Sequence, residues 1–557
     1  MNFYETLDEK QLDGVTILEE FLENDNVDND KMFLFEGQGG SGKTYSISRL
    51  IFKNTETKFI FLCPTHKALS VLKKTIEQFL RTNDIPVSID FGSSFYTIAS
   101  FFVKKLFYDK NGNSSFRSVG RIKTKIDEML NDKNPDDKLC IVVDECSMIN
   151  YQQFMDFNKL LDMYSFIKII FIGDRNQLPY IKERGIINNT DIIEEAIDME
   201  LPTDIKNTLD KFINYTEFLS PIFTQVPQQY LLKSFKRSDK EDLKEIVFSL
   251  KEGVVKNEFN ERKFFKMIKE SKNATKLSIE KFKKLIKKKK MIKGIAHTNK
   301  QKDAYNNIVR KLLYKKHEHY NTYKYVEDDI IIFDTTAIIN EFEKFQNNTE
   351  LKILSSMYDM NINLSFKKLL GFKITYQHMN TVDVETKERH TISQVSLKDE
   401  ERFVKFCKVI RSFFVKKIRK NNRTGKNIER CFCNICENVI RPKEQKFGTD
   451  EVCCLICYNK LQRIYKEECM ETKKEGEAYN KLMSEIDSYK YKFNMPCSYA
   501  YCITIAKSQG STFKNVLYIH NTDTFKVERN YKRTMTRNIY TAVSRTSHRL
   551  YTMKKFL

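Results

Sequence analysis

A glycine-rich segment, Gly37–Thr44, has the residue types and spacing of a phosphate-binding loop. It reads Gly-Gln-Gly-Gly-Ser-Gly-Lys-Thr and lies between an apolar run at 32–35 and an amphipathic stretch at 45–52, which predicts strand, loop and helix. Backbone N–H groups of such a loop surround phosphates, Lys43 neutralises them, and Thr44 can ligate Mg²⁺. A glycine-rich turn without a ligand is the alternative, which this context disfavours. The expected nucleotide-binding residues here are Gly37, Gly39, Gly40, Ser41, Gly42, Lys43 and Thr44.

An acidic pair, Asp144–Glu145, follows another apolar run at 139–143. Acidic residues are common at strand ends, but a phosphate loop needs an acidic partner on a neighbouring strand. Asp144 would hold Mg²⁺, usually through water, and Glu145 would orient and deprotonate an attacking water. The two motifs together favour nucleotide hydrolysis.

A cysteine cluster has the spacing of a zinc site. Cys433-x-x-Cys436 and Cys454-x-x-Cys457 are separated by 17 residues. Four thiolates close a tetrahedron around Zn²⁺, so a structural role is expected. Cys431 and Cys453 are alternative ligands. Basic neighbours would also suit contact with nucleic acid or a partner: Arg430, Arg441, Lys443 and Lys446.

The elements that must position these residues follow an α/β pattern over about 1–221. Apolar runs at 32–35, 59–62, 139–143 and 167–172 alternate with amphipathic stretches, which predicts buried parallel strands. The same rhythm returns at 294–312, 499–505 and 516–519. Between these last stretches lie β-like runs at 330–333 and 372–376, a basic helix around 403–420 and the cysteines. We interpret this region as an insert in one α/β domain.

Two further segments have an ambiguous pattern. The lysine-dense stretch 263–293 is predicted to be a solvated helix or linker, with phosphate contact as the less favoured interpretation. Asn111–Gly112, flanked by aromatic residues within 106–116, predicts a β-hairpin.

Composition limits the class of protein. The 557 residues suggest roughly three to four domains of about 150 residues. The net charge of +21 favours a polyanionic partner, most simply nucleic acid, with lysine-rich solvated surfaces as the alternative. No signal peptide and no apolar run long enough for a membrane helix is found. We therefore expect a soluble intracellular protein whose cysteines are reduced or metal-bound.

Taken in order, the motifs resemble those of superfamily 1 helicases of the RecD/Dda type. The resemblance covers the α/β regions but not the insert. It implies that Gln11 reads adenine, that Gln177 couples the γ-phosphate to the nucleic acid, and that Arg237 and Arg545 are arginine fingers reaching the nucleotide from the second domain. It adds Gly510 to the nucleotide site. Tyr180 and Ala99 depart from the family pattern without removing a charge. The implied nucleic-acid contacts are Pro64, Thr65, His66, Ser100, Thr504, Lys507 and Ser508.

The resemblance also implies a domain plan. Two RecA-like domains are expected: the first at 1–225, with a wedge-type insertion at about 103–138, and the second at 226–335 and 491–557. The zinc-containing insert would occupy 336–490, with its module at about 431–458. The fold class is therefore α/β with a small insertion in the first motor domain and a large one in the second.

The implied function is ATP-dependent unwinding of DNA, 5′→3′, in replication, recombination or repair. ATP, Mg²⁺ and structural Zn²⁺ are the expected cofactors. Single-stranded DNA, duplex junctions and replication or recombination proteins are the expected partners, and no membrane is. The Lys- and Asn-rich composition is typical of AT-rich genomes such as those of large DNA viruses or phages. Alternatives are an RNA helicase of the zinc-carrying viral type and a non-enzymatic nucleic-acid-binding scaffold. The compartment, whether nucleus, cytoplasm or viral factory, stays open.

Overall fold

The computed structural model divides into two compact units. The first unit comprises Met1–Tyr305 and Cys502–Leu557, and the second comprises Asn306–Tyr501. Each is described by itself. The residues that the structure describes are 7–24, 31–54, 56–82, 94–108, 114–118, 122, 126, 138–180, 219–288, 292–339, 344–416, 431–440, 446–447, 451–472, 475–520 and 531–554.

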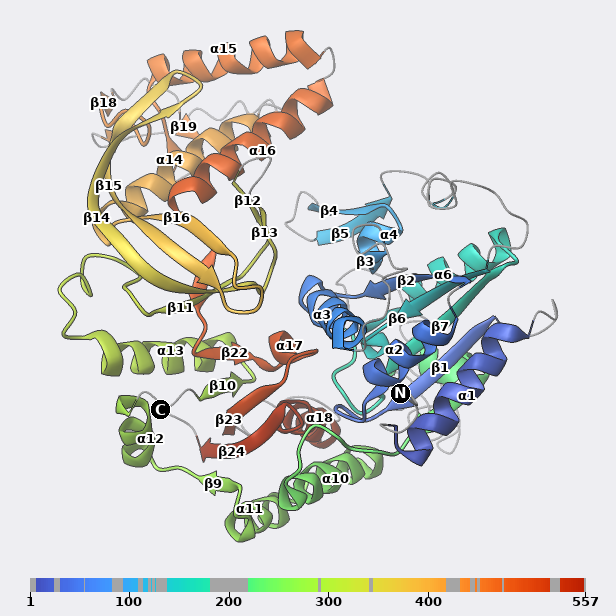
Figure 1. The fold of residues 1–557 in the computed structure, drawn as a ribbon. Coiled ribbons are helices and arrows are strands. Elements are labelled where there is room, and N and C mark those ends of the chain that lie inside the picture. The colour runs from blue at the N-terminus through green and yellow to red at the C-terminus, as the bar shows by residue number, and fades with distance from the viewer. Residues whose placement is uncertain are drawn as a thin grey trace, which may run out of the picture. The chain divides into compact units, whose positions relative to one another are not determined.

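The first unit contains a six-stranded parallel sheet in the order β3-β2-β6-β7-β1-β8 (Figure 1). All four apolar runs predicted as strands at 32–35, 59–62, 139–143 and 167–172 lie in this sheet. Its strands are β1 (Met32–Gly37), β2 (Thr57–Cys63), β3 (Phe95–Thr97), β6 (Lys138–Val143), β7 (Ile167–Gly173) and β8 (Gln228–Leu232).

Helices cover both faces of this sheet, because side chains alternate between the faces along each strand. On one face, Phe35 and Phe61 pack with residues of α1 (Glu9–Glu23), α2 (Lys43–Lys53) and α3 (His66–Thr82). On the other, Leu34 and Ile60 pack with residues of α4 (Ile98–Phe101) and α6 (Tyr151–Met163). The sheet is thus buried on both sides, as its continuous apolar strands predict.

A second parallel sheet in the same unit has the order β22-β10-β23-β24-β9. Its core packs against α10 (Glu241–Lys256), α11 (Glu261–Glu270) and α18 (Tyr531–Val543). This half of the unit also contains two shorter helices, α12 (Ile279–Lys287) and α17 (Ile505–Ser508). Its strands are β9 (Ala274–Lys276), β10 (Lys293–Ala296), β22 (Cys502–Thr504), β23 (Phe513–His520) and β24 (Thr546–Lys554). The presence of two parallel sheets confirms the predicted α/β class with two such halves.

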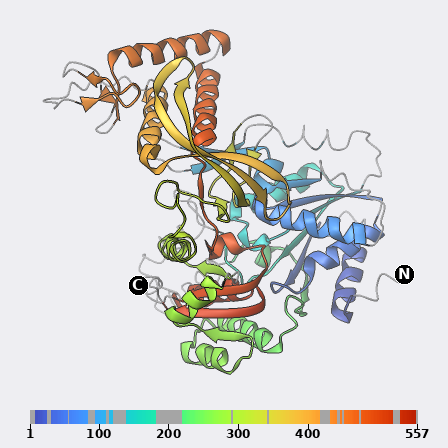
Figure 2. The ribbon, with the colours of Figure 1, turned by 60° about the vertical axis from the view of Figure 1, so that its left-hand side comes forward.

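The second unit is built on an antiparallel sheet, β16-β15-β14-β11-β21. Figure 2 shows its long hairpin, β14 (Glu350–Phe366) and β15 (Leu369–Asp383), curving over the helices. Leu364 and Ile374 of this hairpin share a core with α14 (Leu397–Lys416), α15 (Leu455–Thr472) and α16 (Glu475–Phe493). The remaining strands are β11 (Ile330–Phe333), β16 (Arg389–Val395) and β21 (Cys497–Tyr499).

Observed boundaries differ from the predicted limits of the domains. The antiparallel sheet begins at β11 and ends at β21, outside the predicted insert at 336–490, because β11 pairs with β14 of the hairpin and β21 pairs with β11. Likewise β8, beyond the predicted end of the first domain at residue 225, pairs with β1. The lysine-dense stretch 263–293 forms parts of α11 and β10, with β9 and α12 between them, rather than one helix or linker.

The predicted hairpin in the first domain is present as β4 (Lys104–Tyr108) paired antiparallel with β5 (Ser114–Ser118). Its turn, with Asn111 and Gly112, lies outside the described residues, as does most of the predicted wedge at 103–138.

Candidate nucleotide and nucleic-acid site

The phosphate loop connects β1 to α2, as predicted. Gly40 and Gly42 have φ values of +88° and +91°, which only glycine adopts without strain. The Lys43 ammonium donates to the carbonyl oxygens of Gly37 and Gln38, at 2.5 and 3.1 Å. Burial lowers the pKa of Lys43, while the nearby carboxylates of Asp174 and Asp144 oppose this shift. The loop therefore places a cation and several N–H groups at the N-terminus of α2, which suits a phosphate chain.

Gln11 lies against this loop. Its Nε2 atom donates to the Ser41 carbonyl oxygen at 3.2 Å, and the residue is 2% exposed. A capping box fixes it, since Asp8 accepts from the Gln11 N–H and the Gln11 side chain accepts from the Asp8 N–H. A Cβ atom on Gly42 would lie 2.2 Å from Gln11 Nε2. The structure thus brings the predicted adenine-reading residue to the loop.

The acidic pair follows β6, which is separated from β1 by β7 alone. The Asp144 N–H donates to the Leu62 carbonyl oxygen of β2 at 2.9 Å, and the Asp144 carboxylate accepts from the Glu145 N–H at 2.8 Å. Burial, and then the charge of Glu145, raise the pKa of Asp144 to about 7. Such a carboxylate gains from a bound cation, because the cation offsets the charge that burial disfavours. Asp144 thus lies near Lys43, which is the chain neighbour of Thr44, the other predicted magnesium ligand.

Asp174, at the end of β7, joins the phosphate loop to the second sheet. Its Oδ2 atom accepts from the Gly39 N–H at 3.0 Å and from the Tyr540 hydroxyl of α18 at 2.6 Å. The Asn176 N–H donates to the other carboxylate oxygen at 3.0 Å. One buried carboxylate oxygen therefore connects the loop of the first sheet to a helix of the second.

Arg545 also crosses from the second sheet to the first. It follows α18, is 1% exposed, and donates to Gln177 Oε1. Gln177 is 3% exposed and lies 3.5 Å from Asp174 Oδ2 through its Nε2 atom. The predicted coupling glutamine and the predicted second arginine finger are thus hydrogen-bonded partners.

Arg237 reaches the loop by a different route from the one predicted. It follows β8 of the first sheet, and its N–H donates to the Gly40 carbonyl oxygen at 3.1 Å. Its guanidinium donates to the Ser544 carbonyl oxygen at 2.6 Å. Burial, and then the charge of Arg545, lower the pKa of Arg237 to about 9. Arg237 therefore lies on the segment between the two sheets: β8 keeps it beside the loop, while the neighbouring Phe235 packs on the core of the second sheet.

The predicted nucleic-acid contacts lie at the carboxyl ends of neighbouring strands. Thr97 and Thr504 each cap a four-residue helix, accepting from the N–H groups of Ser100 and Lys507 at 3.2 and 3.4 Å. Pro64, Thr65 and His66 lead from β2 into α3. Ser100 is exposed, Lys507 is half-buried, and Ser508 is fully buried, with its hydroxyl donating to the Ile505 carbonyl oxygen at 2.6 Å. Ser508 therefore supports the turn rather than presenting a free hydroxyl.

Gly510 is a close-approach position. Its φ is +75°, and a Cβ atom there would lie 3.4 Å from the Ala68 Cα atom and 3.9 Å from Glu145 Oε1. The motif after β22 is thus packed beside both the acidic pair and the start of α3. This packing brings Gly510 close to Glu145 of the acidic pair and to Ala68, which lies near the predicted nucleic-acid residue His66.

The four predicted zinc ligands of the second unit do converge. The sulfur atoms of Cys433, Cys436, Cys454 and Cys457 all lie within 4.8 Å of one another. A hydrogen bond from Cys457 lowers the pKa of Cys433 to about 5, and backbone N–H groups contribute against the effect of burial. Four thiol ligands with N–H donors fit a zinc ion, so the cluster could hold one. Cys453 is buried but outside this group, and the side chain of Cys431 is not described.

Two residues of this site were not assigned a role by their sequence pattern. Asp174 and Tyr540 are 366 residues apart, so no local spacing signals their contact. The capping-box pattern Asp8-x-x-Gln11 is a local signal that could have located the start of α1.

Comparisons with known proteins agree with the position of the loop. Residues 24–183 match a family model described as AAA domain. The chain is 27% identical over 554 residues to an uncharacterized protein, R530, of Acanthamoeba polyphaga mimivirus, covering 95% of this chain and 96% of that protein. The family match contains the phosphate loop, the acidic pair and Asp174.

Solved structures similar to the chain are helicases. One, of two coordinating Pif1 helicases and DNA unwinding at forked dsDNA, has 11% identity, a TM-score of 0.45 and coverage of 98% of this chain and 91% of that one. The Pif1 helicase from Bacteroides in complex with ADP-AlF3 and ssDNA has 11% identity, a TM-score of 0.46 and coverage of 97% and 91%. That from Candida albicans has 10% identity, a TM-score of 0.43 and coverage of 98% and 94%. None of the described helices has the length and hydropathy to cross a bilayer.

Proposed function

We propose that this protein is an ATP-dependent DNA helicase that moves 5′→3′ along single-stranded DNA. The main support for this proposal is the contact between the two sheets of the first unit. Arg545 donates a hydrogen bond to Gln177, and Tyr540 donates one to Asp174. A nucleotide on the phosphate loop would be touched from both sides. Its hydrolysis would therefore change how the two sheets hold each other.

The residues around the phosphate loop would take the following roles in hydrolysis. Lys43 and the loop N–H groups bind the phosphates, with the nucleotide replacing Asp174 as the acceptor for Gly39. Glu145 holds the attacking water and accepts its proton. Arg545 stabilises the charge that develops on the transferred phosphoryl group, because a guanidinium stays charged and presents a planar fork. Magnesium on Thr44 and Asp144 would supply further neutralising charge.

The nucleic acid would lie across the capped turns after β2, β3 and β22. N–H groups and hydroxyls at these turns suit phosphates, which gives binding without regard to sequence. Gln177 and Gly510 stand between this surface and the nucleotide. The preference for DNA and the 5′→3′ direction rest on the resemblance of the motifs. The β4–β5 hairpin is the candidate for the pin that splits the duplex.

Strand separation tests this proposal directly. Duplexes with a single-stranded tail at the 5′ or 3′ end, made of DNA or RNA, would be mixed with protein, ATP and Mg²⁺. We expect unwinding of DNA duplexes with a 5′ tail, and ATPase activity stimulated by single-stranded DNA. Unwinding of RNA alone would support the RNA helicase instead. Absence of nucleic-acid-stimulated ATPase would instead support the non-enzymatic nucleic-acid-binding scaffold.

We further propose that Cys433, Cys436, Cys454 and Cys457 bind one structural zinc. Cys436→Ser should lose the metal and unfold the loop around 431–458, since metal binding and local folding are one equilibrium in small modules. Metal analysis should give about one zinc per chain for the wild type. Basal ATPase should persist, because both motor sheets have their own cores.

The matched control for this variant is Cys469→Ser, which changes a half-buried cysteine of α15 outside the cluster. It should keep the zinc. Wild-type protein without zinc would reject the module. A Cys436→Ser protein that retained its zinc would place Cys431 or Cys453 among the ligands.

A further inference from the structure

One short segment carries a large share of the net charge of the protein. Residues 261–288 contain eleven Lys and Arg against three Glu, a net charge of +8, while all 557 residues together have +21. All eleven cations are exposed. We call them the β9-edge basic surface: Arg262, Lys263, Lys266, Lys269, Lys272, Lys276, Lys281, Lys283, Lys284, Lys287 and Lys288.

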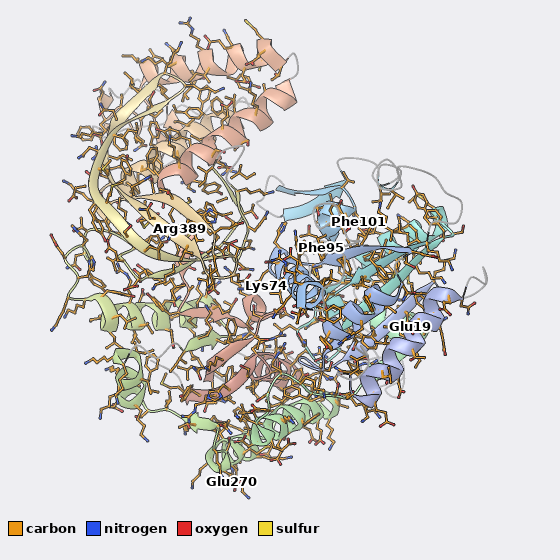
Figure 3. All side chains as sticks on the ribbon, viewed as in Figure 1. Glu19, Lys74, Phe95, Phe101, Glu270 and Arg389 are labelled. Atoms are coloured by element: carbon orange, nitrogen blue, oxygen red, sulfur yellow. The ribbon has the colours of Figure 1, made fainter. Side chains whose placement is uncertain are left out.

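Amphipathic helices on either side of β9 create this surface. Phe264 and Ile268 of α11, and Phe282 and Ile286 of α12, are buried, which turns the lysines of both helices outward. Within the described part of the chain, the ion pairs leave ten of these cations without an acidic partner. The exception is Lys266, whose Nζ atom lies 3.8 Å from Glu270 Oε1. Figure 3 shows Glu270 on the outside of α11. Solvated surfaces usually mix both signs more evenly, so a segment with eleven cations and three Glu is unusual.

The β9-edge basic surface is separate from the predicted nucleic-acid track. β9 is one edge strand of the second sheet, and β22, which leads into Thr504 and Lys507, is the opposite edge. Three strands lie between them, so the two edges are about 19 Å apart at the usual strand spacing. A single strand held at the capped turns would not cover this surface.

We propose that the β9-edge basic surface binds the phosphate backbone of double-stranded nucleic acid. Its side chains fit backbone contact and not base stacking, because Phe264 and Phe282 are buried. Phe265 is half-buried, with the Lys276 ammonium 5.2 Å from its ring centroid. Single-strand sites combine cations with exposed aromatic rings, whereas a duplex, whose bases are stacked inside, can be bound through its phosphates alone. This inference rests on the proposed function, since it names the duplex as part of the substrate.

A charge-neutralising variant tests the surface. Lys281→Gln, Lys284→Gln and Lys288→Gln together remove three cations that share one face of α12 and its last turn. The control removes three exposed cations from α14 of the second unit, as Lys398→Gln, Lys405→Gln and Lys408→Gln. Affinity would be measured by fluorescence anisotropy over a salt series, for a short blunt duplex and for a single strand.

We expect the α12 variant to bind the duplex about tenfold more weakly at low salt. The slope of log affinity against log salt concentration should fall by the equivalent of up to about three phosphate contacts. Single-strand affinity and the KM for ATP should stay within about twofold. Equal loss in the α14 control, or equal loss of single-strand binding, would overturn the inference. If the wild type binds neither nucleic acid, the proposed function fails. If it unwinds normally while the α12 variant binds duplex as well as wild type, only this inference fails.

Discussion

The two parallel sheets of the first unit repeat one arrangement at the ends of two adjacent strands. Cys63 of β2 pairs with Thr97 of β3, and Ala296 of β10 pairs with Thr504 of β22. In both sheets a second threonine follows the first partner by two residues. These threonines, Thr65 and Thr298, cap α3 and α13 (Asn299–Tyr314) with hydrogen bonds of 3.3 Å. Even the residues after the edge threonines agree, as Ile-Ala in both.

The two sheets differ in the charged and polar groups that they contribute to the site. The first carries the phosphate loop after β1 and the acidic pair after β6. The second contributes Tyr540, which lies in α18, and Arg545, which follows that helix. The threonine caps thus occur in both sheets, whereas the phosphate loop and the acidic pair belong to the first. The difference teaches that, on the proposed function, hydrolysis at the first sheet would reach the second through contacts such as Arg545 with Gln177 and Tyr540 with Asp174.

Removing the Lys43 ammonium from the phosphate loop of the first sheet should have the largest effect on ATPase activity. Lys43→Ala should lower ATPase by about a hundredfold or more, because the loop loses its neutralising charge. Nucleic-acid binding should survive, since the capped turns are unchanged. Steady-state hydrolysis and anisotropy would measure the two properties. Robust ATPase in this variant would remove the phosphate loop from the mechanism.

Removing the cation from the second sheet should slow turnover without losing the nucleotide. Arg545→Ala should lower kcat by about a hundredfold and leave nucleotide affinity within a few-fold, because the guanidinium acts on transition-state charge. Arg545→Lys should restore little, since an ammonium lacks the planar fork. Single-turnover hydrolysis and equilibrium nucleotide binding separate the two effects. An unchanged kcat would contradict the proposed role.

A single hydroxyl between the sheets should have an intermediate effect. Tyr540→Phe removes the donor to Asp174, and kcat should fall about tenfold, as expected for a hydrogen bond to a carboxylate. The KM for ATP should change little, which distinguishes loss of positioning from loss of binding.

Tyr518→Phe is the matched control for Tyr540→Phe. Tyr518 is also fully buried in this sheet, and its hydroxyl has no hydrogen-bond partner among the described residues. It should behave as wild type. Equal kcat values for the two variants would argue that Tyr540 only fills space.

The threonine repeat should give the smallest effect and tests the comparison most closely. Thr298→Val and Thr65→Val should each weaken single-strand binding about fivefold, because each loses a cap of about 1 kcal/mol. Thr275→Val, at the exposed opposite edge of the second sheet, is the control and should bind normally. If only Thr65→Val weakens binding, the second sheet does not repeat the nucleic-acid role of the first.

Local patterns predicted much of the site, because its chemistry begins at strand ends. The loop after β1 and the acidic pair after β6 follow continuous apolar runs and were found from spacing alone. The same holds for the cysteine cluster, where two Cys-x-x-Cys motifs specify one site. The position of Arg237 between the two sheets could not be predicted, because the pairing of β8 with β1 is a long-range contact.

Elements of the second unit were less visible for a different reason. β14 and β15 are 17 and 15 residues long, but three register shifts interrupt their pairing. Each shift reverses which residues face the core, so no steady alternation of polar and apolar residues marks the strands. The contact of Asp174 with Tyr540 could not be read from either segment alone.

The pairing of β11 with β21 has a consequence for how such a chain can be rebuilt. Ile331 lies opposite Tyr499 and Phe333 opposite Cys497, so the two strands that flank residues 334–496 are hydrogen-bonded neighbours. A two-residue Asn-Gly turn can close an antiparallel pair of this kind. We therefore expect that a different module can be joined to β11 and β21 in place of residues 334–496, if it also supplies the strand that now pairs with β11.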